Sequence, residues 1–290
     1  MKLRFFTVML AALLMTGCGR ELKDMEQGNS VYFWRTELLL DSVERAFLQQ
    51  YDIDKVYCRY FDVVMDEATA LPRPNATIAF SDTLPASVAL VPTVYITEDC
   101  MHQAHEGLAR QLVSRVVQMN ATHDIGGVSE LQIDCDYTAR SRKTYYDFLE
   151  EVRREAAIHG LRLSTTIRLH QLSMPVPPAD YGVLMLYNTG DPRRFEERNP
   201  VLDQRDVVPY VSRLPSYALP LAAAYPVYRW QRQVQGVRIE HTVEASEILA
   251  VKRMVEQKRP ALSRSIVVYN LDEENINRYS NDTYKAIYHH

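Results

Sequence analysis

Short runs of apolar and β-branched residues recur along the chain at even intervals, and this spacing constrains the fold more than any other feature of the sequence. The runs begin on average about 33 residues apart, which is the size of one strand plus the helix that leads to the next parallel strand. Eight such runs predict a single parallel sheet closed into a (β/α)8 TIM-barrel-like domain. The predicted strands are residues 31–35, 55–63, 91–97, 130–138, 161–169, 182–188, 218–225 and 265–271.

Helical patterns fill several of the gaps between these strands. Asp41 has the character of an N-cap, with Glu44 three residues further on as in a capping box. An open doubly wound sheet is the main alternative fold, but no GxGxxG turn follows the first strand to support it. The predicted helices are residues 42–51, 102–119, 141–158 and 243–257.

Two segments depart from the regular alternation. Residues 171–181 contain three prolines and leave no room for a normal helix, so we expect one outer helix to be missing or short. Residues 225–241 fit neither a helix nor a barrel strand, and their aromatic and basic side chains suit a loop over the mouth of the barrel.

The N-terminus has the pattern of an export signal. Lys2 and Arg4 precede an apolar run that ends at Met15, which is shorter than the roughly 20 residues of a membrane-spanning helix. Small residues then lead into Cys18. We expect cleavage before this cysteine. The domain boundaries are then a signal peptide at 1–17, a tether at 18–30 and the barrel at 31–290.

The string Met15-Thr-Gly-Cys18 resembles the lipobox of bacterial lipoproteins. The resemblance implies that Cys18 is acylated and anchors the protein in a lipid bilayer. Gly19 is not the aspartate associated with inner-membrane retention, so the resemblance implies the outer membrane, with the periplasmic or surface face left open. The alternative is an ordinary secretory peptide with an incidental cysteine.

The remaining cysteines and the charge exclude several classes of protein. Cys58 and Cys135 fall on the second and fourth strands, about 9 to 10 Å apart by strand spacing, which is too far for a disulfide. We expect them to be buried packing residues, and the pairing state of Cys100 stays open. No CxxC pair or Cys/His ligand spacing occurs, so neither a metal nor another cofactor is expected. A net charge of −4 without a Lys/Arg cluster argues against nucleic acid as a partner.

Polar side chains on the inner face of the predicted barrel are the strongest functional signal. In residues 130–138 the period of two places Asp134 and Asp136 opposite an apolar face that should meet the helices, so both aspartates should point inward. The same pattern aims Arg168 and His170 inward on the fifth strand. Barrels normally fill this space with branched apolar residues. The candidate ligand-binding residues are Trp34, Arg59, Asp134, Asp136, Arg168, His170, Tyr187, Asn188 and Asp272.

Two interpretations of these inner charges remain open. They form an internal ion-pair network, with Arg59 and Arg168 against Asp134 and Asp136, because lone buried charges are too costly. Alternatively they line a polar ligand pocket at the carboxyl ends of the strands. Glu98 follows the third strand and is either a cap for the next helix or, with Asp136, a candidate catalytic carboxylate.

The strings Ile133-Asp-Cys-Asp-Tyr-Thr138 and Leu184-Met-Leu-Tyr-Asn188 resemble the DxDxE and M-x-Y-D strands of chitinase-type glycoside hydrolases, which are (β/α)8 barrels. The resemblance assigns Asp134, Asp136 and Tyr187 to the sugar site. Thr138 stands where the catalytic glutamate belongs, and a threonine hydroxyl is no general acid near neutral pH.

A longer resemblance covers most of the mature chain and is to an uncharacterised group of Gram-negative lipoproteins. It implies the fold and the location but no chemistry. Asn270 stands where that group has a histidine. The matching strings are residues 31–36, 55–62, 91–97, 132–136, 166–171 and 268–272.

Three functions are compatible with the sequence. The first is a lipid-anchored barrel that binds carbohydrate, or a related polar ligand, without hydrolysis. The second is an active glycoside hydrolase whose acid comes from another strand end, with Glu98, Asp62, Asp272 or Glu273 as candidates. The third is a structural or assembly component of the cell envelope, in which the barrel interior only supports the fold.

Overall fold

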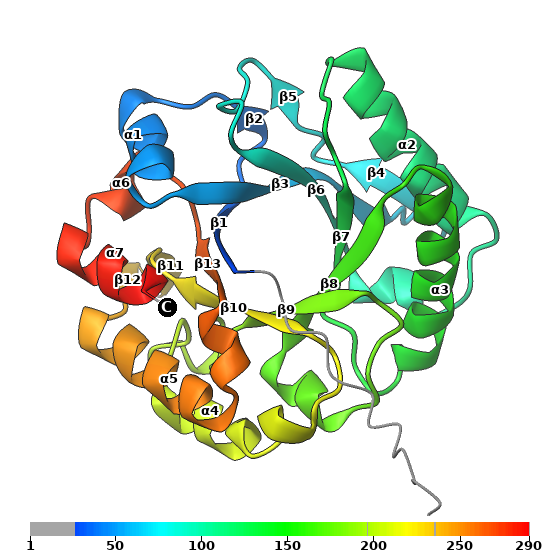
Figure 1. Cartoon of the computed structure of the whole chain (residues 1–290). Helices are drawn as coiled ribbons and strands as arrows, with labels where there is room; N and C mark the ends of the chain where they lie inside the picture. Colours follow the sequence, from blue (N-terminus) through cyan, green and yellow to red (C-terminus); the bar gives the residue numbers. More distant parts are fainter. Residues whose placement is uncertain (1–26, 196, 235, 290) are drawn as a thin grey trace, which may run out of the picture.

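Eight parallel strands, one in each predicted run, pair in chain order in the computed structural model, which describes residues 27–195, 197–234 and 236–289. The ring closes because β1 pairs with both β13 and β3, and helices surround it (Figure 1). The predicted (β/α)8 barrel is therefore confirmed. The barrel strands are β1 (Gly28–Phe33), β3 (Ile53–Met65), β6 (Ala89–Ile96), β7 (Glu130–Asp134), β8 (Arg162–Arg168), β9 (Tyr181–Met185), β10 (Leu221–Pro226) and β13 (Ser265–Tyr269).

The first strand begins earlier than the sequence pattern predicted. Gly28 already pairs with Ser265 on β13, and its N–H donates to the carbonyl of Arg264 at 2.9 Å. Residues 28–30, which we had assigned to a tether, therefore belong to the barrel. The predicted signal peptide, residues 1–17, and the predicted lipidation site at Cys18 lie outside the described residues.

Helix α1 forms as its sequence predicts. The N–H of Glu44 donates to the carboxylate of Asp41 at 2.8 Å, and the N–H of Asp41 donates to Glu44 at 3.0 Å, which completes the capping box. The second predicted helix begins later than expected, because Gly107 adopts a left-handed conformation (φ 75°) just before it. The helices are α1 (Ser42–Gln50), α2 (Leu108–Thr122), α3 (Arg142–Ile158), α4 (Gln204–Val211), α5 (Ala245–Lys258), α6 (Glu273–Ile276) and α7 (Asn281–Tyr288).

The two irregular segments have different outcomes. Between β8 and β9 the chain forms only a short 3-10 helix, so the prediction of a missing outer helix is confirmed. Within residues 225–241, where we expected a loop, residues 230–234 and 237–241 instead pair as an antiparallel hairpin in which Trp230 lies opposite His241. The 3-10 helices are η1 (Glu98–Met101), η2 (Leu169–Ser173), η3 (Pro192–Arg194), η4 (Leu214–Ser216) and η5 (Pro260–Ser263).

Among the residues that the structure describes, five further strands lie outside the eight-stranded ring. β4 pairs antiparallel with the end of β3, and β2 pairs with β5. Within the described residues, no helix is both long and apolar enough to span a lipid bilayer. These additional strands are β2 (Glu37–Leu38), β4 (Pro72–Asn75), β5 (Ala79–Phe80), β11 (Trp230–Val234) and β12 (Val237–His241).

Candidate functional site

The polar candidates on β7 and β8 point into the barrel near the carboxyl ends of these strands. Ile133 on β7 is the register partner of Thr165 on β8. Because side chains alternate along a strand, the even-numbered residues of both strands therefore lie on the same face. Thr166 on β8 donates from its hydroxyl to the carboxylate of Asp134 on β7 at 2.6 Å. Two residues further along the sequence from each of these, Arg168 donates from Nε to the carboxylate of Asp136. The inward direction predicted for Asp134, Asp136 and Arg168 is therefore confirmed. His170 was expected to continue the alternation on the fifth strand, but β8 ends at Arg168 and His170 lies in the 3-10 helix η2.

Asp134 is buried, with 3% of its surface exposed. Burial raises the pKa of this carboxyl to about 6, and the neighbouring charge of Asp136 adds to the rise, while Arg168 and the bond from Thr166 oppose it. Because the ionised form is disfavoured, Asp134 takes up a proton more readily than an ordinary aspartate.

Asp136 and Arg168 form an ion pair at the rim. The side chain of Asp136 is 45% exposed, whereas that of Arg168 is only 16% exposed and lies over the ring of Tyr187, 5.9 Å from its centroid. Burial alone disfavours the charged guanidinium, but Asp136 and Asp134 outweigh it and hold the pKa of Arg168 above its usual value. This pair is the one part of the predicted ion-pair network that occurs as expected.

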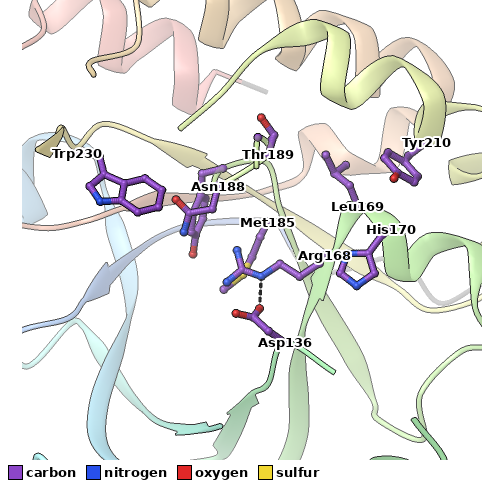
Figure 2. A pocket seen from close by; sticks show the side chains of 11 residues that line it. Asp136, Arg168, Leu169, His170, Met185, Asn188, Thr189, Tyr210 and Trp230 are labelled. Carbon is purple, nitrogen blue, oxygen red and sulfur yellow. Dashed lines mark hydrogen bonds and ion pairs between the residues drawn. The ribbon is translucent and has the colours of Figure 1, made fainter. Parts of the chain in front are cut away.

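A cavity of about 360 Å³ opens beside this ion pair (Figure 2). It brings together five of the predicted residues, which are contributed by the ends of β7, β8 and β9. Aromatic side chains from α4 and β11 also line it. The lining residues are Asp136, Arg168, Leu169, His170, Met185, Tyr187, Asn188, Thr189, Gly190, Tyr210 and Trp230.

Arg59 faces inward as predicted but does not pair with Asp134 or Asp136. Its Nε donates to Asp62 at 2.8 Å, and its guanidinium lies 5.8 Å from the centroid of Trp34. The register between β3 and β6 shifts after Arg59, which is a bulge that turns Asp62 to the same face. Neither Arg59 nor Trp34 lines the cavity beside Arg168.

Asp272 is also outside that cavity. Its carboxylate accepts from the N–H of Asn275 at 3.0 Å and caps α6. It lines a second depression of about 540 Å³, which shares Asn188 and Trp230 with the first. Between the two cavities, the hydroxyl of Tyr228 donates to the side-chain oxygen of Asn188. Six of the nine predicted site residues therefore line these two neighbouring cavities, whereas Trp34, Arg59 and Asp134 line neither of them.

Glu98 supports the loop that follows β7. Its carboxylate accepts from the hydroxyl of Ser141 at 2.8 Å and from the N–H of Thr138 at 3.2 Å. Burial raises the pKa of Glu98, but these hydrogen bonds outweigh it and leave the pKa below its usual value. Thr138 is exposed, and its hydroxyl accepts from the N–H of Arg140 at 3.2 Å. The position where the resemblance expects an acid is thus part of a loop-and-helix junction.

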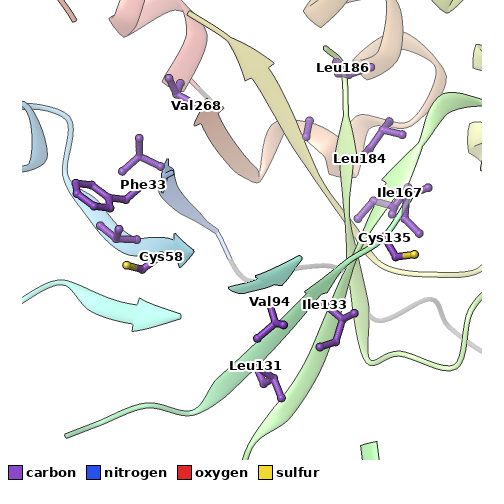
Figure 3. Close-up of a cluster of buried hydrophobic side chains, with 14 of the residues drawn as sticks. Phe33, Cys58, Val94, Leu131, Ile133, Cys135, Ile167, Leu184, Leu186 and Val268 are labelled. Carbon is purple, nitrogen blue, oxygen red and sulfur yellow. The ribbon is translucent and has the colours of Figure 1, made fainter. Parts of the chain in front are cut away.

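The opposite faces of the same strands are apolar (Figure 3). Ile133 and Cys135 on β7 and Ile167 on β8 pack beneath the helices, fully buried. Cys58 occupies the equivalent face of β3. Cys58, Cys100 and Cys135 are all free thiols in buried positions, as predicted for the first and the last of them.

Six lining residues were not predicted as site residues, and Trp230 and Tyr210 are the two that come from outside the ends of β8 and β9. Trp230 comes from the hairpin, and the aromatic content of residues 225–241 was the only sequence signal for it. Tyr210 comes from α4, for which no pattern was recognised. No group of three or more His, Cys, Asp or Glu side chains suited to a metal ion occurs in the part of the chain that the structure describes.

The closed barrel is similar in fold to several solved structures. Solved structures with this fold include the chitinase from Chromobacterium violaceum ATCC 12472, with a TM-score of 0.55 and 14% identity over 90% of this chain and 98% of that one. They include the spore cortex-lytic enzyme SleL of Bacillus megaterium QM B1551, with a TM-score of 0.57 and 11% identity over 91% and 75% of the two chains.

A third similar structure is catalytic domain 2 of Ostrinia furnacalis Group II chitinase in complex with (NAG)5, with a TM-score of 0.51 and 10% identity over 91% of this chain and 96% of that one. At these identities the likeness shows the fold alone. No protein-family model and no curated protein sequence matches the chain.

Proposed function

We propose that this protein is a carbohydrate-binding barrel of the glycoside hydrolase type that does not hydrolyse its ligand. The observation that carries the proposal is the cavity at the carboxyl ends of β7 to β9, where Asp136, Arg168 and Asn188 offer hydrogen bonds beside the aromatic rings of Tyr187 and Trp230. Sugar recognition needs this combination, because hydroxyl groups require polar partners and the faces of the ring are apolar.

The proposal of binding without hydrolysis rests on the surroundings of Thr138. Glycoside hydrolysis needs a carboxylic acid to protonate the leaving oxygen. Thr138 cannot supply it, and the nearby carboxylate of Glu98 accepts hydrogen bonds that lower its pKa and favour its ionised form.

An active hydrolase with an acid from another strand end is the alternative. Asp62 is paired with Arg59, and Asp272 caps α6, so each is occupied by another contact. Burial raises the pKa of Asp134 to about 6, but the hydrogen bond from Thr166 and the burial of the side chain hold this carboxyl beneath the cavity. These contacts favour binding over hydrolysis. A purely structural envelope role would leave the cavity without a ligand.

We further propose export and anchoring in the outer membrane through acylated Cys18, in keeping with the lipobox-like Met15-Thr-Gly-Cys18 and the Gly at position 19. Cys18→Ser should release the protein from the membrane fraction, because the acyl chains would be its anchor. A variant that still pellets with membranes after high-salt washing would refute lipid anchoring as the only attachment.

A glycan array probed with the purified protein tests the binding proposal. We expect one group of related glycans to bind, and Asn188→Ala to weaken that binding about 10-fold or more through loss of a hydrogen-bonding group. The same glycans incubated with the protein should stay intact by mass spectrometry. Release of shorter products would favour the hydrolase, and a negative array would favour the structural role.

A further inference from the structure

Two buried polar groups at the cavity have no hydrogen-bond partner among the described residues. They are Nη1 of Arg168 and the hydroxyl of Tyr187. Tyr187 is 3% exposed, and the Arg168 side chain 16%. An unsatisfied buried polar group is costly, so a ligand in the cavity that hydrogen-bonds to these two groups would gain affinity from them.

Arg168 and Asn188, which line this cavity, each keep a hydrogen-bond donor for a ligand. Arg168 uses Nε for Asp136, which leaves the end of its guanidinium fork for another acceptor. Asn188 accepts from Tyr228 through its oxygen, so its amide nitrogen is the group that remains. Asp136 is the one carboxylate in the lining, and Arg168 neutralises it.

From this arrangement we infer that the ligand is an acidic sugar whose carboxylate binds the guanidinium fork of Arg168 and the hydroxyl of Tyr187. The inference rests on the proposed carbohydrate-binding function and specifies its ligand class. Planar carboxylates match the two-pronged geometry of a guanidinium, which neutral hydroxyl groups do not. The exposed part of Asp136 remains available to accept from sugar hydroxyls.

The charges around Arg168 are compatible with an incoming anion. Asp136 is its ion-pair partner, and Asp134 lies on the same inner face. Farther along the mouth Arg59 and Asp62 neutralise each other. Because burial raises the pKa of Asp134 to about 6, this carboxyl can take up a proton when a carboxylate arrives, which relieves the repulsion between them.

Matched acidic and neutral sugars test the inference by isothermal titration calorimetry at pH 6 with the purified full chain. The probes are tri-galacturonate against its methyl ester, glucuronate against glucose, and N-acetylmuramate against N-acetylglucosamine. We expect the acidic member to bind at least about 10-fold more tightly in each pair that binds, as for a charge-assisted bidentate contact. The preference should weaken at high salt.

Two variants locate the contact. Arg168→Lys keeps the charge but removes the fork and should reduce the acidic preference about 10-fold or more. Tyr187→Phe removes one hydroxyl and should weaken the acidic probe about 3- to 10-fold, in a variant whose fold circular dichroism verifies. Arg153→Lys is the matched control, since Arg153 pairs with Asp180 at 2.9 Å with a half-exposed side chain and should leave the preference unchanged.

Each outcome separates this inference from the function on which it rests. Neutral sugars that bind as tightly as their acidic partners overturn the acidic ligand and leave carbohydrate binding intact. An acidic preference that survives both Arg168→Lys and Tyr187→Phe overturns the assignment to this cavity. If no probe binds and the glycan array is also negative, both the ligand class and the proposed function fail.

Discussion

The stability of the Asp134→Asn variant, relative to that of the wild type, should increase as the pH rises. The folded state raises the pKa of Asp134 from 3.8 to about 6, mainly through burial. Below pH 3.8 the carboxyl is protonated in both states. Between the two pKa values the unfolded state releases the proton first, so ionisation favours unfolding, and the stabilising effect of the bound proton is lost as the pH passes 6.

The size of the effect follows from the pKa difference. A shift of about two pKa units corresponds to about 3 kcal/mol of unfolding free energy over the full range, of which about 2 kcal/mol falls between pH 4 and pH 7. Asparagine cannot ionise, and its side-chain oxygen can still accept the bond from Thr166. The stability of Asp134→Asn relative to the wild type should therefore increase by about 2 kcal/mol over this interval.

Urea unfolding followed by circular dichroism at pH 4, 5, 6 and 7 measures this change. Asp147→Asn is a suitable control, because Asp147 lies on the outer surface in an exposed pair with Lys143 and should contribute less than about 1 kcal/mol. A difference between wild type and Asp134→Asn that stays constant with pH would refute the reasoning. A difference of opposite sign would mean that Arg168 stabilises the ionised form more than burial opposes it.

Three further predictions concern the site and the barrel. Asp136→Asn should cost only about 1 kcal/mol or less by chemical denaturation, because Asp136 is 45% exposed and Asp134 remains beside Arg168, while ligand affinity should fall about 10-fold or more; a loss of 3 to 5 kcal/mol, as estimated for a broken buried pair, would instead assign the pair to the fold. Thr138→Glu should fold normally, since Thr138 is exposed, and a chromogenic glycoside assay should detect no turnover, because residue 138 does not line the cavity; measurable release would show that the acid alone was missing. Separate fragments 27–160 and 161–290 should be insoluble when expressed alone, because each exposes unpaired strand edges at the β7 and β8 junction, and a stable monomeric fragment would argue against a cooperative barrel.

The alternation of residues along the strands could be predicted because it is a local property. Side chains alternate between the two faces of a strand, which predicts that Asp134 and Asp136 face opposite to the buried Cys135. The structure places both aspartates on the inner face, as this alternation requires. The bulge after Arg59, which turns Asp62 to the inner face, could not be predicted in this way, because it depends on how β3 pairs with β6. Pairing between strands is not encoded in either strand by itself.

The walls of the cavity were harder to predict for the same reason. Trp230 and Asp136 line one cavity although a long stretch of chain separates them, and their proximity depends on closure of the barrel and on the hairpin. The start of the second helix was also predicted wrongly. The apolar pattern extends back to residue 102, but α2 begins only after Gly107, whose left-handed conformation apolar periodicity does not predict.

The polar residues of the inner face have two different roles, which depend on their depth in the barrel: an internal network in the middle and a ligand pocket at the mouth. In the middle of the barrel the hydroxyl of Tyr32 donates to Gln132 at 2.9 Å, Gln132 donates to Ser164 at 3.4 Å, and Ser164 donates to Glu130 at 2.7 Å. This chain of hydrogen bonds ends at Glu130, whose other carboxylate oxygen forms an ion pair with Lys55 at 3.6 Å, so its members need no ligand. At the mouth, Arg168 and Tyr187 keep buried donors that no described residue satisfies. A structural role explains the first group and not the second, so substitutions in the middle should lower stability, whereas substitutions at the mouth should act mainly on ligand binding.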